Sequence, residues 1–303
     1  MNYYKIRSWI IGKAKSIFRI YNFSVFMRRR RQKFEKLFYC KKYTVDDIIG
    51  ALKAAGLKQG KPIIVHSAMG NFYNFEGTAE ELIRKLLDFV GPEGTVCMPA
   101  YPKDKFDNSQ IFDIRMSTSA AGYLSEIFRQ KEGVYRSMNQ LHSVCAFGKD
   151  ADYITRDHHL SDISFDQYSP FSRIAELGGY SVSLGMPKWY IGTGEHICEA
   201  KLFGRLKIFT EKFKHVKVYT YKNIDGEIIK HSMHAESDYQ FVRRHSTRLI
   251  DKYFDKSKYG RVKLSNIWVT VFDMDYLSNR LGELALQGKT IYKYPNNILR
   301  DEK

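Results

Sequence analysis

Histidine, serine, arginine and glutamate side chains that could move protons or bind an anion fall in loops after predicted strands and at helix starts. Two histidines are adjacent at His158 and His159, and His196 precedes Glu199 by three residues. Open α/β sheets place their ligands at strand ends, and histidine readily exchanges a proton near neutral pH. The pattern marks candidates for acid–base chemistry, although His196 and Glu199 would equally form an ordinary surface pair on a helix.

Several sequence motifs of common enzymes are absent. The chain has no Walker loop, no Gly-x-Gly-x-x-Gly after a predicted strand and no Gly-x-Ser-x-Gly elbow. These absences argue against nucleotide hydrolases, dinucleotide enzymes and ordinary esterases. The pair His231 and His234 has no third ligand nearby, so no metal centre is expected. The four cysteines are far apart and include no Cys-x-x-Cys pair, which argues against disulfides and favours a reducing, cytoplasmic compartment.

The elements that would position the candidate residues alternate between strand and helix from residue 43 onward. Strand signals occur at 62–65 and 95–98. The helix between them begins at the capping box of 78–81 and ends at Gly91-Pro92. A strand, a helix and a strand within about 40 residues predict a βαβ unit with a parallel strand pair.

Further elements continue the alternation. We expect helices at 44–56, 121–130, 171–177, 195–203, 239–254 and 275–285, and strands at 144–147 and 182–184. Two late strands, 217–221 and 227–230, flank an Asn-Ile-Asp-Gly turn and predict an antiparallel hairpin. With no repeat or linker, residues 43–303 are expected to form one α/β domain whose parallel or mixed central sheet is flanked by helices.

Charge separates an amino-terminal arm from this body. The 303 residues are 44% hydrophobic and 15% aromatic, which is enough for a large core, and the formal net charge is +16. Residues 1–42 contribute +12 of that charge, and residues 43–303 contribute +4. Apolar residues recur at helical spacing between 6 and 25, and the arginines 28–31 follow. The arm is therefore expected to be a basic amphipathic helix followed by a second helical segment.

Two interpretations of the arm remain open. A basic helix with an aromatic-rich apolar face can lie on an anionic membrane, which would place the protein on the inner membrane face. Alternatively, the apolar stripe packs on the body or on a second subunit, in a homo-oligomer. The apolar runs are too short for a membrane span and lack the features of a signal peptide. Nucleic acid is not an expected partner, because no binding motif accompanies the charge.

Four motifs in the body together resemble the aminoglycoside 3-N-acetyltransferase family. In chain order they are Val65-His66-Ser67-Ala68 with 90–99, Arg136-Ser137 with 143–148, 157–160 with Ser169-Pro170, and the His-x-x-Glu stretch of 195–199. Each motif is weak alone, but the four occur in the family's order between residues 44 and 201. The arm lies outside the resemblance.

The resemblance implies direct transfer of an acetyl group from acetyl-coenzyme A to an amino group of a sugar ring. His158 occupies the position of the family's catalytic histidine, and Glu199 would fix the tautomer of its ring. The positions that match the coenzyme site are Ser67, Arg136, Ser137 and Ser143. A guanidinium suits a phosphate at such a site because it donates two parallel hydrogen bonds.

The chain departs from the family at Asn139-Gln140, where His-Pro is usual. An asparagine cannot take a proton, and without proline the loop is less constrained. The departure puts the geometry of the coenzyme loop in question more than the base, and His142 is a candidate substitute for the missing histidine.

The charge of the chain also bears on the acceptor. Polycationic drugs favour clustered carboxylates, whereas this chain is basic. We therefore expect an amino sugar that carries negative charge or a lipid, such as a nucleotide- or lipid-linked precursor of a surface glycan. The first alternative is an aminoglycoside 3-N-acetyltransferase that confers antibiotic resistance. The second is a membrane-recruited binding protein of the same fold without turnover.

Overall fold

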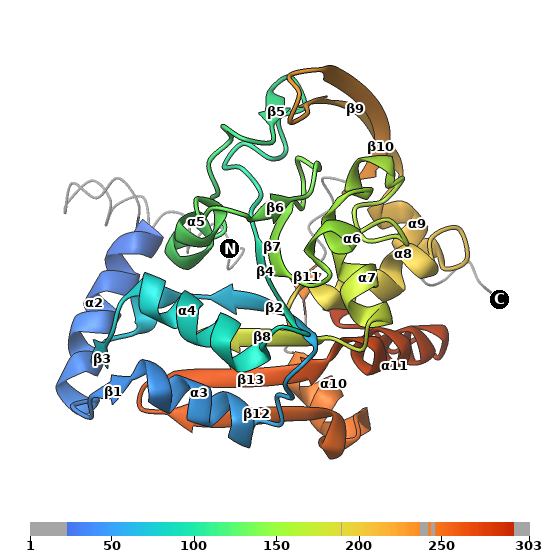
Figure 1. The fold of residues 1–303 in the computed structure, drawn as a ribbon. Helices are drawn as coiled ribbons and strands as arrows, with labels where there is room; N and C mark the ends of the chain where they lie inside the picture. The colour runs from blue at the N-terminus through green and yellow to red at the C-terminus, as the bar shows by residue number, and fades with distance from the viewer. Residues whose placement is uncertain (1–22, 189, 237–241, 244–245, 294–303) are drawn as a thin grey trace.

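A seven-stranded mixed sheet lies at the centre of the computed structural model, which describes residues 23–188, 190–236, 242–243 and 246–293 (Figure 1). In spatial order the strands are β12 (Tyr259–Leu264), β13 (Ile267–Asp273), β8 (Tyr180–Leu184), β2 (Pro62–Ser67), β4 (Thr95–Pro99), β7 (Val144–Gly148) and β6 (Tyr135–Arg136). The central strand β2 is parallel to both β4 and β8, and the remaining pairs are antiparallel. The expected α/β class with a mixed sheet is confirmed.

The predicted βαβ unit is present as β2, α4 (Ala79–Val90) and β4. Thr78 caps α4 by accepting a hydrogen bond from the backbone N–H of Glu81, at 3.0 Å. Gly91, at φ 70°, ends the helix in a conformation that glycine adopts without strain. Local capping chemistry therefore fixes this unit where the sequence places it.

Helices cover both faces of the sheet because β2 is apolar on both of its sides. Ile63 and Val65 pack with α3 (Val45–Ala54), α4 and α5 (Tyr123–Arg129). Ile64 points to the opposite face. The helices on that face are α6 (Ala151–Thr155), α7 (Pro170–Glu176) and α8 (His196–Lys201). A buried central strand with alternating faces gives the three-layer arrangement seen in Figure 1.

Smaller elements surround this core. A third cluster of buried residues contains parts of α9 (Lys207–Lys212), α10 (Ser246–Tyr253) and α11 (Met274–Leu286). The predicted late hairpin is present as β9 (His215–Lys222) and β10 (Ile228–Ala235), with β5 (Ile111–Asp113) parallel to β9. The two-stranded pairs are β1 (Tyr43–Thr44) with β3 (Phe75–Glu76), and β11 (Val242–Arg243) with β14 (Tyr292–Lys293).

Two parts of the carboxyl-terminal region differ from the sequence-based expectation. The β12–β13 hairpin was not predicted, and its two-residue turn contains Ser265 at φ 49°. Such turns favour Asn-Gly or Asp-Gly, so Ser265-Asn266 gives little signal. The helix expected over 239–254 begins only at Ser246 in the structure, and residues 242–243 form β11 instead.

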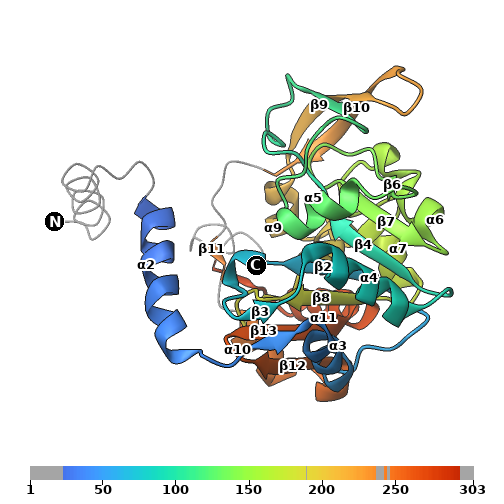
Figure 2. The same cartoon turned by 60° about the vertical axis from the view of Figure 1, so that its left-hand side comes forward.

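The arm contributes one described helix, α2 (Phe23–Phe38), which stands at the edge of the molecule (Figure 2). The amphipathic helix expected before it falls on residues 1–22, outside the described part of the chain. The division into an arm of 1–42 and a domain of 43–303 stays a prediction. Within the described residues, no helix combines the length and hydrophobicity needed to cross a membrane.

Candidate active site

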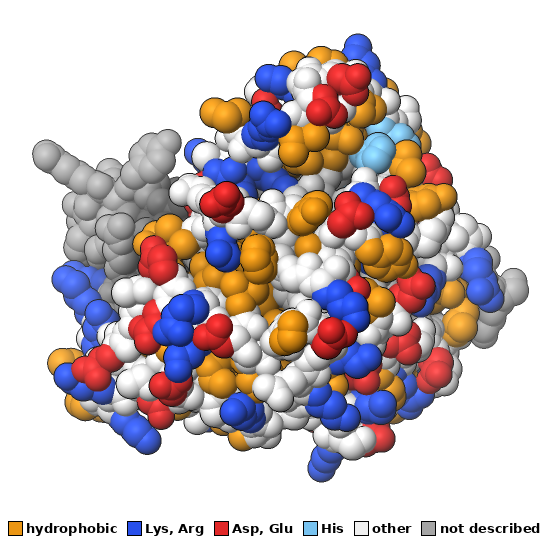
Figure 3. Space-filling view, in the orientation of Figure 1, with side chains coloured by type: hydrophobic (Ala, Val, Ile, Leu, Met, Phe, Trp, Pro, Cys, Tyr) orange, Lys and Arg blue, Asp and Glu red, His pale blue; other side chains and the backbone are white. Residues whose placement is uncertain are grey.

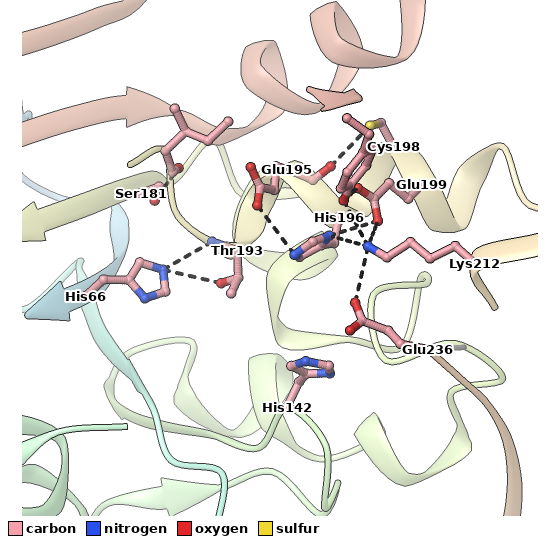
Figure 4. Close-up of polar contacts among 12 residues, drawn as sticks. His66, His142, Ser181, Thr193, Glu195, His196, Cys198, Glu199, Lys212 and Glu236 are labelled. Atoms are coloured by element: carbon pink, nitrogen blue, oxygen red, sulfur yellow. Dashed lines mark hydrogen bonds and ion pairs between the residues drawn. The ribbon is translucent and has the colours of Figure 1, made fainter. Parts of the chain in front are cut away.

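A cluster of charged side chains forms around His196, the first residue of α8 (Figure 4). The chain reaches α8 from the parallel strand β8, through Gly192 and a 3-10 turn at Thr193–Glu195. Gly192 has a φ of 83°, and a Cβ there would collide with Ser181 Oγ on β8. The absence of a side chain at Gly192 therefore lets this segment lie against the sheet and sets where α8 begins.

His66, at the end of β2, holds the same segment from the other side. The backbone N–H of Thr193 donates to His66 Nε2 at 3.4 Å, so this nitrogen acts as an acceptor. Burial lowers the pKa of His66 to about 4, which keeps the ring neutral at physiological pH. His66 is thus a structural histidine that ties β2 to the start of α8.

Glu199 lies one turn after His196 and fixes its tautomer. His196 Nδ1 is 2.8 Å from Glu199 Oε2. Because a carboxylate accepts hydrogen bonds, Glu199 favours a proton on Nδ1, while Nε2 lies 3.5 Å from Glu195 Oε1. His196 is 5% exposed and Glu199 1% exposed. A histidine oriented in this way by a carboxylate has the arrangement of a general base and its partner.

Lys212, on α9, lies in the middle of the cluster. Its Nζ is 2.5 Å from Glu199 Oε2 and 3.2 Å from Glu236 Oε1. Nζ also donates to the hydroxyl of Tyr292 at 2.9 Å, and this hydroxyl in turn donates to Glu199 Oε1. The lysine is therefore a buried cation shared by two carboxylates, and Figure 4 shows it beside the His196 ring.

The charges of this cluster stabilise one another. Burial alone would raise the pKa of Glu199, but the charges and hydrogen bonds of His196 and Lys212 lower it below its usual range. Burial would lower the pKa of Lys212, and Glu199 and Glu236 instead raise it. Glu236 also has a lowered pKa, because Lys212 and His196 outweigh its burial. Both carboxylates are thus ionised at neutral pH.

A second histidine faces the same region across an aromatic ring. Phe165 lies between His142 and His196, with ring-centroid distances of 4.4 Å and 4.7 Å. Lys105 Nζ is 3.4 Å from His142 Nε2. Burial and, to a smaller degree, the charge of Lys105 lower the pKa of His142 well below its usual value. His142 is therefore a neutral ring beside the cluster.

The structure places His158 in a different network. The residue is fully buried, its Nδ1 is 2.8 Å from Ser137 Oγ and its Nε2 is 3.1 Å from the Ser164 carbonyl. Burial lowers its pKa to about 3. Both ring nitrogens have partners, and neither partner is Glu199. The structure thus brings Glu199 to His196, and the role of His158 as the base stays a prediction.

The predicted coenzyme residues are only partly brought together. Ser137 and Ser143 are fully buried, and Ser143 Oγ donates to the Ser137 carbonyl at 2.7 Å. Arg136 donates to the carbonyls of Ala100, Ile114 and Ser117, so its guanidinium fastens the 100–117 loop. Burial lowers its pKa to about 10. Ser67 lies apart from these three, at the end of β2, and is partly exposed.

Asn139 and Gln140 make a compact loop in place of the family's His-Pro. Asn139 Oδ1 accepts from the backbone N–H groups of Leu141 and His142, at 3.1 and 3.0 Å. Gln140 Nε2 donates to the Asp107 carbonyl at 2.6 Å. Side-chain hydrogen bonds thus supply the restraint that proline gives elsewhere.

Three members of the cluster were missed from the sequence: Lys212, Glu236 and Tyr292. They lie on α9, after β10 and in β14, and no local pattern links them to α8. The spacing of His196 and Glu199 was the only available signal. In the described residues, no group of three His, Cys, Asp or Glu side chains has an arrangement able to bind a metal ion.

Comparison with known proteins agrees with the sequence motifs. The family model for aminoglycoside 3-N-acetyltransferase matches residues 64–282. A prophage-derived aminoglycoside N(3')-acetyltransferase-like protein of Bacillus subtilis, YokD, is 29% identical over 47% of this chain and 60% of its own length. Aminoglycoside N(3)-acetyltransferase III of Salmonella sp. is 28% identical over 52% of this chain and 60% of its length. The matched region thus spans about three fifths of these curated relatives.

Solved structures show the same fold. The aminoglycoside acetyltransferase AAC(3)-IVa, a histidine-to-alanine variant in complex with a gentamicin, superposes with a TM-score of 0.66 at 22% identity. The match covers 82% of this chain and 90% of the other. AAC-IIIb in a binary complex with CoASH gives a TM-score of 0.66 at 19% identity, over 84% of this chain and 100% of the other. By its motifs, its fold and the family model that spans most of its body, the chain belongs to the aminoglycoside 3-N-acetyltransferase family.

Proposed function

We propose that the protein transfers the acetyl group of acetyl-coenzyme A to an amino group of an aminoglycoside-like amino sugar. The charged cluster at His196 is the observation that carries this proposal, because amine acylation requires a base beside the acceptor nitrogen. The names of the relatives favour an aminoglycoside acceptor over the glycan precursor expected from net charge.

The local charge also favours this acceptor. Glu199 and Glu236 lie beside His196, and Glu195 Oε1 is 3.5 Å from its Nε2. Three carboxylates thus lie in a region with two lysines, Lys212 and Lys105. An acceptor with several ammonium groups is attracted to such a region. The basic net charge of the chain, which resides mainly in the arm, does not describe this site.

In the proposed reaction His196 Nε2 takes a proton from the acceptor ammonium or from the amine as it attacks. The amine nitrogen bonds to the thioester carbonyl carbon, the carbon–sulfur bond breaks, and coenzyme A leaves as a thiolate that takes up a proton. The carboxylate of Glu199 stabilises the imidazolium that forms. Lys212 and Tyr292 position Glu199 and do not touch the reacting atoms.

The coenzyme residues inferred from the resemblance require a separate test. Ser67 is partly exposed, so a coenzyme could contact it in its present position. Arg136 would have to release the carbonyls of Ser117 and Ala100 before it could bind a phosphate. Calorimetry of acetyl-coenzyme A with the purified protein measures binding directly. Weaker binding by Arg136→Ala with unchanged thermal stability would support a phosphate contact. A large loss of stability would assign the arginine to the 100–117 loop instead.

The proposed activity is tested by following thiol release from acetyl-coenzyme A in the presence of an acceptor panel. The panel should contain aminoglycosides, glucosamine and a nucleotide-linked amino sugar. We expect the largest kcat/KM with an aminoglycoside. A larger kcat/KM with the nucleotide-linked sugar would instead support the glycan-precursor acceptor expected from the sequence. Coenzyme binding without thiol release from any acceptor would favour a non-catalytic binding protein.

A further inference from the structure

The helix α2 rests on the body through a polar side. Gln32 Nε2 donates to the Gly70 carbonyl at 2.9 Å, and Tyr73 OH donates to Glu35 Oε2 at 2.6 Å. Tyr39, just after the helix, accepts at its carbonyl from Asn74 Nδ2. Residues 32, 35 and 39 follow helical spacing and thus mark the side that faces the body.

The apolar residues of the same helix point elsewhere. Met27, Phe34, Leu37 and Phe38 are 49%, 63%, 72% and 69% exposed. Met27, Phe34 and Phe38 are seven and four residues apart, which places them in one row along the helix. The rings of Phe34 and Phe38 are in contact, with centroids 5.0 Å apart. We call these four residues the α2 apolar face. The apolar stripe predicted earlier in the arm falls mainly on residues 1–22, outside the described part of the chain, and its packing on the body or on a second subunit stays a prediction.

Basic residues border the α2 apolar face. At 100° per residue, Arg30 and Arg31 fall on either side of the row that contains Phe34. Both are exposed, as is Lys33, whereas Lys36 lies over the Tyr73 ring on the side that faces the body. The helix has one acid, Glu35, which is turned toward Tyr73 and paired with Arg31. Figure 3 shows blue side chains along the edge of the molecule that α2 forms.

We propose that the α2 apolar face docks on an anionic lipid bilayer, with Phe34, Leu37 and Phe38 among the headgroups. This inference is independent of the enzymatic proposal. Exposed aromatic and aliphatic side chains bordered by cations match a surface that is negative outside and apolar beneath. A second copy of this chain is a poorer partner, because two arms of +12 each would be brought together.

Cosedimentation of the full chain with lipid vesicles tests the proposal. We expect binding to phosphatidylcholine vesicles with about 30% phosphatidylglycerol, little binding to pure phosphatidylcholine, and weaker binding in about 0.5 M salt. The double variant Phe34→Ser and Phe38→Ser should lower the partition coefficient about tenfold or more. Because both residues are exposed, its thermal unfolding should match that of the wild type.

A matched control is available on the β9–β10 hairpin, far from α2 in Figures 1 and 2. Ile224 and Ile228 are 58% and 53% exposed, and Ile224→Ser with Ile228→Ser should leave vesicle binding unchanged. Wild-type binding by the Phe34/Phe38 variant would overturn the proposal, as would failure of the wild type to bind anionic vesicles. If sedimentation velocity instead shows that this variant converts an oligomer to a monomer without changing vesicle binding, the face joins two chains and the proposal is also wrong.

Discussion

His196 and His158 differ in the partners that fix their ring nitrogens. Glu199 accepts the Nδ1 proton of His196, and the Nε2 of this ring lies 3.5 Å from Glu195 Oε1. In His158, a serine hydroxyl and a backbone carbonyl occupy the two nitrogens. An imidazole with both nitrogens bonded inside the core cannot receive a proton from an acceptor unless those bonds break. Substitution of His196 and substitution of His158 are therefore expected to affect turnover and stability differently.

The first prediction concerns the base. His196→Ala should lower kcat by about two to four orders of magnitude with little change in coenzyme affinity. Glu199→Gln should cause a smaller loss, because the ring keeps a partner but its charged form loses stabilisation. Thiol release and calorimetry measure the two quantities.

His158→Ala is the informative comparison for that prediction. It should reduce thermal stability, since Ser137 Oγ and the Ser164 carbonyl lose a buried partner. Folded His158→Ala protein that has lost turnover, beside a fully active His196→Ala, would reverse the assignment of the base.

The second prediction concerns Lys212. Lys212→Met should lower the free energy of unfolding by about 3–5 kcal/mol, because it leaves the buried carboxylates of Glu199 and Glu236 without the cation that they share. Lys214→Met is the matched control, since Lys214 and its partner Glu211 are 39% and 37% exposed and such pairs contribute about 1 kcal/mol or less. Urea denaturation gives both values, and equal effects would show that the buried cluster adds no special stability.

Among the elements, the connection from β8 to α8 decides where His196 lies. Its local signals are weak: Gly192 and Gly194 are typical of a loop, and nothing nearby shows that Gly192 must pass beside Ser181 and His66. The βαβ unit was predictable because its caps and apolar runs are local. The cluster was not, because Lys212, Glu236 and Tyr292 reach Glu199 only through tertiary packing.

Gly192→Ala tests this connection. The new Cβ would collide with Ser181 Oγ and stand 3.1 Å from His66 Nε2, so we expect loss of stability together with loss of turnover. Gly204→Ala is the control, because Gly204 also has a positive φ, of 75°, but no atom lies within 4 Å of the added Cβ. The control should cost about 1 kcal/mol from backbone conformation alone and keep its activity. Equal stability and equal activity in the two variants would contradict the proposed role of the close packing.

At the scale of the whole molecule, buried neutral histidines make stability depend on pH. The pKa values of His66 and His158 are about 4 and about 3 in the folded protein, and that of His142 is also lowered by burial. The unfolded chain has ordinary values near 6.5 and so binds more protons below that pH. Their contribution is therefore fully present above about pH 6.5 and falls as the pH is lowered toward the folded-state values.

We expect the free energy of unfolding to decrease by up to about 1.4 kcal/mol per pH unit for each of these histidines below pH 6.5. Urea denaturation between about pH 7 and pH 5 samples this window before most carboxylates titrate. His215→Asn should leave the slope unchanged, because His215 is exposed. A stability that is constant from pH 7 to pH 5 would contradict the burial of neutral rings.

Tyr292 also imposes an order of events while the protein is being made. Its hydroxyl reaches Glu199 although 93 residues separate the two. A nascent chain leaves the ribosome amino terminus first, so every strand of the seven-stranded sheet, of which β13 is last at Asp273, emerges before Tyr292. The partners of Glu199 and Lys212 are complete only after this tyrosine has left the exit tunnel. An mRNA truncated before the Tyr292 codon would yield a chain that has all seven strands of the sheet but an incomplete charge cluster.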